Sequence, residues 1–150
     1  MNLPIFKLLS LICICFSLCT VNAAEIDDIY KKNKNKLKDG QVMNIQSYLF
    51  TSSFSKTTTE NIDYEKNKLR CYSYLLDYIG SNISWPKKIS KNLQKELWSF
   101  YIKEKHFTLK NSKVVDFGLV GDNYYVVVGV SKDNIEPKSP TFKDIINLLQ

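Results

Sequence analysis

Cysteine and histidine are scarce in this 150-residue sequence, and their positions exclude several kinds of chemistry. Three of the four cysteines lie within the first 19 residues, so Cys71 is the only cysteine in the rest of the chain. One cysteine cannot form an intramolecular disulfide, and together with the single histidine, His106, it cannot supply the usual four ligands of a zinc site. We therefore expect no metal site, and a fold that depends on its hydrophobic core.

Residues that often act in catalysis are present, but not in catalytic patterns. His106 is expected at a helix end, where a histidine interacts with the last carbonyl groups, and no Gly-x-Ser-x-Gly motif occurs. Glu96 and Glu104 lie eight residues apart beside lysines, which is typical of a solvent-exposed helix face. Asp116 interrupts an apolar strand, where alternation allows it to point to solvent.

Motifs for phosphate, calcium and dinucleotide binding are also absent from the sequence. Together with the scattered acids and the single histidine, this absence predicts no catalytic residues, no cofactor-binding residues and no cofactor. We therefore expect that the protein is not an enzyme.

The sequence has no apolar run long enough to cross a membrane, which requires about 20 residues. Its longest run, residues 8–19, follows the positively charged Lys7 and precedes small residues, with Val21 and Ala23 at the positions that signal peptidase reads. This pattern predicts that residues 1–23 are an export signal peptide, cleaved after Ala23 or, as second choice, after Ala24.

Two other interpretations of this N-terminus are weaker. An uncleaved anchor would need a longer apolar run, and a lipoprotein acylated on Cys19 would need a small residue where Leu18 stands. Removal of residues 1–23 lowers the formal net charge from +6 to about +5. A single lysine before the apolar run is typical of a Gram-negative signal, so we expect a periplasmic protein, with secretion as the alternative and no membrane span after cleavage.

Residues 24–40 form a basic segment that we interpret as an N-terminal helix or a linker. Tyr30 is its only aromatic residue, whereas nucleic-acid sites usually combine basic and aromatic side chains, so we expect no nucleic-acid partner. The lysines of this segment are Lys31, Lys32, Lys34, Lys36 and Lys38.

Residues 41–150 have the pattern of one α+β domain. Residues 41–50 alternate as in a strand, which the polar run 51–59 is expected to end. The spacing of Thr57 and Glu60 matches a capping box, and the following helix should end at Gly80 and Ser81. Its predicted apolar stripe comprises Ile62, Leu69, Tyr72, Leu75, Leu76 and Ile79.

Three further elements complete the predicted domain. A second long helix spans residues 88–105, and residues 114–120 and 124–130 form a hairpin around a turn that begins at Gly121. The second arm is apolar on both faces, which fits a central strand or the interface of a homo-oligomer. Ser139 and Pro140 are expected to start a last short helix.

The predicted fold is thus a small single α+β domain, in which an antiparallel sheet with a C-terminal β-hairpin carries two long helices and a short terminal helix. Its nine tyrosines, which combine an apolar surface with a polar tip, fit either a core or a protein interface.

Binding is the function that these absences leave. The leading hypothesis is a non-catalytic periplasmic accessory protein that binds other envelope proteins, for instance in assembly of a pilus, secretion or flagellar apparatus. A periplasmic inhibitor or immunity protein against an enzyme or toxin is the alternative, and a small envelope hydrolase is a weaker one.

Overall fold

The computed structural model describes residues 25–104, 108–109, 112–136 and 141–149. The predicted signal peptide, His106, and the Ser139 and Pro140 start of the last helix lie outside these residues. The chain divides into two compact units, Met1–Asn35 and Lys36–Gln150. In the first unit, residues 25–33 form a helix on which Lys31 and Lys32 are exposed. None of the described helices has the length and apolar character needed to cross a membrane.

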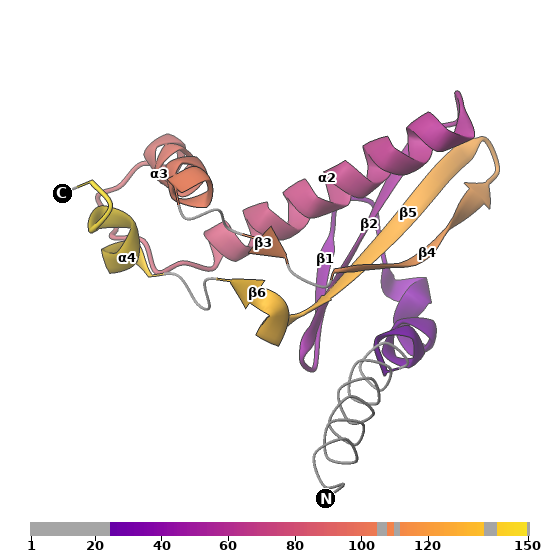
Figure 1. The fold of residues 1–150 in the computed structure, drawn as a ribbon, viewed down its shortest axis with the longest axis horizontal. Helices are drawn as coiled ribbons and strands as arrows, with labels where there is room; N and C mark the ends of the chain where they lie inside the picture. Colours follow the sequence, from indigo (N-terminus) through magenta and orange to yellow (C-terminus); the bar gives the residue numbers. More distant parts are fainter. Residues whose placement is uncertain (1–24, 105–107, 110–111, 137–140, 150) are drawn as a thin grey trace, which may run out of the picture. The chain divides into compact units, whose positions relative to one another are not determined.

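A four-stranded antiparallel sheet forms the centre of the second unit (Figure 1). Its strands are β1 (Val42–Ile45), β2 (Tyr48–Lys56), β4 (Lys113–Val120) and β5 (Asn123–Ser131), in the order β1-β2-β5-β4. The apolar strand β5 is therefore central, as its sequence allowed. The predicted α+β class, with an antiparallel sheet and a C-terminal hairpin, is confirmed.

Three helices belong to this unit. The long helix α2 (Glu60–Ser81) lies along one face of the sheet, while α3 (Lys91–Glu104) and the short α4 (Phe142–Ile146) lie towards its C-terminal end (Figure 1). The indole N–H of Trp98 in α3 donates to the carbonyl of Leu76 in α2 at 3.0 Å.

The short connecting elements comprise the 3₁₀ turns Lys34–Lys36 and Lys132–Asn134, and the strands β3 (Thr108–Leu109) and β6 (Ile135–Glu136), which pair with each other.

The β4–β5 hairpin closes through a tight turn in which Gly121 has φ +58°. Only glycine adopts this conformation without steric cost, and Val120 pairs directly with Asn123 across the turn. The ladder shifts by one residue between Val114 and Asp116, which marks a β-bulge. The predicted hairpin is therefore confirmed, with its turn where glycine placed it.

The prediction of one strand over residues 41–50 was wrong. The chain turns back at Gln46, which has φ 53°, so this segment supplies β1 and the start of β2. The strand β2 then continues through the polar run to Lys56. It does so because the Thr51 hydroxyl donates to the Gln41 carbonyl at 3.0 Å and the Ser52 hydroxyl donates to the Lys38 carbonyl at 3.1 Å. Tertiary partners thus allow polar side chains to be buried in the sheet.

The start of α2 also differs from the prediction of a capping box between Thr57 and Glu60. The N-cap is Thr59, whose side chain makes no capping hydrogen bond. Instead, the Asp63 carboxylate accepts from the backbone N–H of Thr58 at 2.7 Å and from its hydroxyl at 3.1 Å.

The starts of the other two helices also lie later than predicted. The helix α3 begins at Lys91 rather than residue 88, after Ser90 accepts from the N–H of Leu93 at 3.3 Å. The helix α4 has Thr141 as its N-cap, in a capping box with Asp144. Both starts follow side chains that satisfy free amides of the first turn.

Candidate functional site

The face of α2 that contacts the sheet is not the apolar stripe that periodicity predicted. Asp63, Asn67, Cys71 and Leu75, spaced four residues apart, are each at most 1% exposed. The predicted stripe is correct for Leu75 and wrong for Ile62 and Leu69, which are 61% and 64% exposed. Two polar side chains are therefore buried where two aliphatic ones were expected.

Asn67 explains this orientation, because its side chain links α2 to both central strands. Its carbonyl oxygen accepts from the Ser53 hydroxyl of β2 at 2.8 Å. Its amide donates to the Ser55 hydroxyl at 2.8 Å and to the Tyr124 carbonyl of β5 at 3.4 Å. A buried amide satisfied by several partners fixes the rotation of the helix, which turns the opposite face to solvent.

Replacing Asn67 by leucine is expected to lower the free energy of unfolding by roughly 2–4 kcal/mol. Leucine has a similar volume but cannot pair with the buried hydroxyls of Ser53 and Ser55. Urea denaturation followed by circular dichroism measures this loss. The control Ser73→Leu, on the exposed face of the same helix, should change stability by less than about 0.5 kcal/mol. Equal stability of the two variants would show that the network does not hold the helix.

Cys71 is fully buried between α2 and the sheet, which confirms its predicted burial. Its thiol donates to the carbonyl of Val126 at 3.4 Å. Burial raises the pKa of the Cys71 thiol from 9.0 to about 12. A thiol with this pKa remains protonated near neutral pH, so it lacks the thiolate that a catalytic nucleophile requires.

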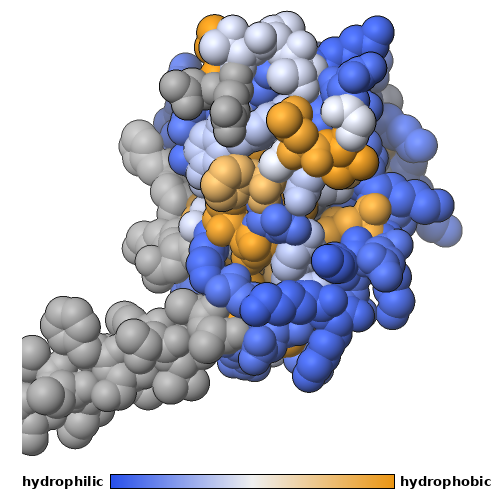
Figure 2. Space-filling view, turned by 90° about the vertical axis from the view of Figure 1, so that its right-hand side faces the viewer, coloured by the Kyte–Doolittle hydropathy of each residue, from blue (hydrophilic) through white to orange (hydrophobic). Residues whose placement is uncertain are grey.

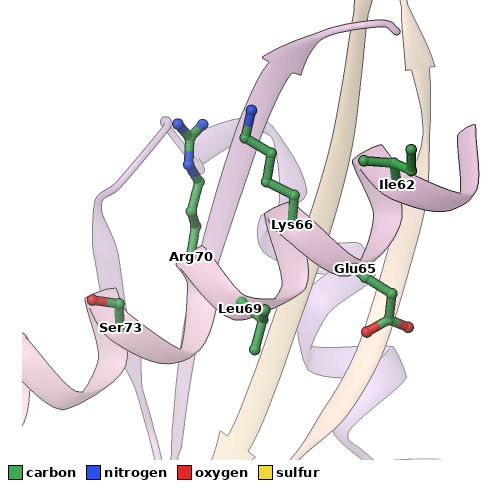
Figure 3. A pocket seen from close by; sticks show the side chains of 6 residues that line it. All are labelled: Ile62, Glu65, Lys66, Leu69, Arg70 and Ser73. Atoms are coloured by element: carbon green, nitrogen blue, oxygen red, sulfur yellow. The ribbon is translucent and has the colours of Figure 1, made fainter. Parts of the chain in front are cut away.

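The outer surface of α2 is the clearest candidate for binding. We define it by the six residues that line a shallow depression along the helix (Figure 3): Ile62, Glu65, Lys66, Leu69, Arg70 and Ser73. Lys66 and Arg70 extend from one side of the helix, and Glu65 and Leu69 extend from the other (Figure 3). Glu65 lies 3.8 Å from Lys68 in an exposed ion pair. The surface thus has an apolar centre and an excess of positive charge at one border.

A second apolar area lies on the neighbouring edge strand β4. Phe117 is 55% exposed and Leu119 is 60% exposed, and alternation places both on the sheet face that carries α2. The Phe117 ring meets Tyr64 of α2 edge-to-face at 5.4 Å between centroids. Figure 2 shows apolar side chains (orange) gathered among polar ones (blue) at the end where α2 begins. Exposed apolar residues that cluster in this way are typical of interaction sites.

The acidic residues considered for catalysis do not assemble into a site. Glu96 and Glu104 are both exposed on α3, and Asp116 is half-buried on β4, where its carboxylate accepts from the Tyr125 hydroxyl at 3.3 Å. In the described part of the chain, no group of three or more histidine, cysteine or acidic residues could hold a metal ion.

The tyrosines do not form the exposed binding surface that their number suggested. Each of the nine tyrosine side chains is buried or half-buried. The exposed large apolar residues are instead aliphatic, apart from Phe117. Sequence reasoning missed Ile62 and Leu69 as surface residues because it assigned them to the core. The available signal was the polar series Asp63 and Asn67, spaced by four in front of Cys71.

No protein-family model matches this chain, and neither the curated proteins nor the solved structures include a significant match. The functional interpretation therefore depends on the geometry of the chain itself.

Proposed function

We propose that this protein is a non-catalytic, exported protein that binds another protein of the cell envelope through the outer surface of α2. The observation that carries this proposal is the exposure of Ile62 and Leu69 on a helix that buries Asp63 and Asn67. Apolar area left in water forgoes about 25 cal/mol per Å² of stabilisation. A partner that covers these side chains would recover this stabilisation on binding.

The charges around this surface define the partner. Lys66 and Arg70 are exposed at its border, whereas the acidic Glu65 is already close to Lys68. Complementary charge steers association and fixes orientation. The partner that fits is a protein surface with apolar side chains at its centre and carboxylates at one edge. The exposed Phe117 and Leu119 of β4 would extend the contact at the same end of the domain.

Export provides the compartment in which such a partner is met. The N-terminal pattern of Lys7, residues 8–19 and Ala23 supports passage through the secretory route. The partner is accordingly sought among periplasmic and membrane-associated proteins.

Photocrosslinking in the native host tests this proposal. A photoreactive amino acid placed at position 69 is expected to form one dominant crosslink to an envelope protein. The control is position 99, because Ser99 is exposed on α3 and does not line the surface. Identical products from both positions, or no product from position 69, would contradict the proposal.

A further inference from the structure

An aromatic cleft lies at the opposite end of α2 from the surface proposed for protein binding. It has a volume of about 700 Å³, is open to solvent, and lies between the C-terminal half of α2, the first turns of α3 and the start of β1. This volume falls within the range of small-molecule sites, about 300–1,000 Å³. Its aromatic lining comprises Tyr74, Tyr78, Trp85 and Trp98.

Hydrogen bonds and close packing hold the two indoles of the cleft in place. The Trp85 indole N–H donates to the Gly80 carbonyl at 3.0 Å, and Trp98 is held by the Leu76 carbonyl. A Cβ at Gly80 would lie only 2.5 Å from the Trp98 indole, so glycine is required for this contact. The Trp85 ring also meets Phe142 of α4 at 5.9 Å between centroids. A binding site built on fixed rings loses little entropy when a ligand is ordered.

Positive charge surrounds one side of the cleft. Lys91 and Lys95 line it and are exposed, and their spacing of one helical turn places their Cβ atoms about 5–6 Å apart. Lys91 is the first residue of α3, and the first turn of this helix contains no acidic residue. The N-terminus of a helix already favours an anion, so two lysines there strengthen the preference. Lys87 and Lys88 are also exposed in the preceding turn.

Hydrogen-bonding groups complete the lining. Asp77, Ser81 and Gln94 all line the cleft. Asp77 brings a carboxylate, which only accepts hydrogen bonds when ionised, and Gln94 brings an amide that both donates and accepts. A purely aromatic acid would meet the rings and the lysines, but it offers no hydroxyl groups to Asp77. A sugar offers both: its hydroxyls pair with Asp77 and Gln94, and the C–H face of its ring packs on aromatic rings.

We propose that this cleft binds a saccharide that carries a carboxylate. The sugar ring would lie against the tyrosine and tryptophan rings, its hydroxyls would donate to Asp77, and its carboxylate would lie between Lys91 and Lys95. This ligand site goes beyond the protein-binding function and uses none of the residues that line the outer surface of α2.

Intrinsic fluorescence provides a direct test, because the two tryptophans of the protein both line the cleft. The full chain is titrated with two acidic sugars, digalacturonate and the disaccharide of N-acetylglucosamine and N-acetylmuramic acid, and with neutral chitobiose. At least one acidic sugar should give a saturable change, with an affinity roughly tenfold above that of chitobiose. Which acidic sugar binds distinguishes a ring carboxylate from a lactyl ether carboxylate.

Variants assign the charge recognition to the two lysines. In the double variant Lys91→Gln and Lys95→Gln, binding of the acidic sugar should fall roughly tenfold, to the level of chitobiose. The control Lys103→Gln, exposed on the same helix outside the cleft, should bind as the unmodified protein does. No saturable change with either acidic sugar up to about 10 mM would overturn the proposal, as would equal binding of the neutral sugar or of the double variant. Loss of sugar binding would leave crosslinking from position 69 unaffected, so the two proposals fail independently.

Discussion

Replacing Val128 by aspartate is expected to leave the protein unfolded. Val128 is fully buried on the central strand β5, between Thr51 of β2 and Val114 of β4. It belongs to the apolar cluster that α2 covers, where no cation is available to pair with a new carboxylate. Burying an unpaired charge costs several kcal/mol, which is comparable to the roughly 5–15 kcal/mol that stabilises a whole domain.

Circular dichroism and the dispersion of proton NMR signals measure this outcome. The matched control is Leu119→Asp, which introduces the same carboxylate on the neighbouring strand, where the side chain is 60% exposed. The control should fold, because its carboxylate stays in water. A Val128→Asp variant that unfolds cooperatively with the stability of the unmodified protein would show that β5 is not the centre of the core.

The Cys71 thiol is expected to react with a thiol reagent at least roughly a thousandfold more slowly in the folded protein than in urea at pH 8. A pKa of about 12 in place of 9.0 lowers the thiolate fraction by this factor, and burial adds steric protection. Mass spectrometry of the peptide that contains Cys71 measures the labelling rate whether or not residues 1–23 are present. Labelling of the folded protein at the unfolded rate would contradict the burial of this side chain.

The same raised pKa makes stability depend on alkaline pH. The unfolded chain loses the thiol proton near pH 9, whereas the folded protein keeps it until about pH 12. The contribution of Cys71 is therefore complete below pH 9 and is lost as the pH rises towards 12. In Cys71→Ala this part of the pH dependence should disappear, so the stability difference from the unmodified protein changes between pH 9 and pH 12. A constant difference across this window would show that the thiol pKa is not raised.

Local sequence rules predicted those elements of the fold that local interactions stabilise. Gly121 and the β-branched arms around it identified the β4–β5 hairpin, and Gly80 with Ser81 identified the end of α2. The strand β2 could not be predicted beyond Phe50, because its hydroxyl groups are satisfied by partners distant in the sequence. Asn67, which accepts from Ser53, is the clearest example.

The candidate sites show the same limit. Helical periodicity assigned Ile62 and Leu69 to the core, since it counts apolar residues and cannot register the tertiary hydrogen bonds of Asn67. The aromatic cleft gathers side chains from two helices, their connection and β1. No linear motif links these residues, although Trp85 did mark the connection between the helices.

The central claim is that the outer surface of α2 binds a protein partner, and a titration of the crosslinked partner against the Leu69→Ser variant tests it most directly. Leu69 is 64% exposed, so the substitution should change the free energy of unfolding by less than about 0.5 kcal/mol. Loss of an apolar side chain from an interface centre should weaken binding at least roughly tenfold, as measured by calorimetry. Unchanged affinity in a folded Leu69→Ser variant would contradict the account.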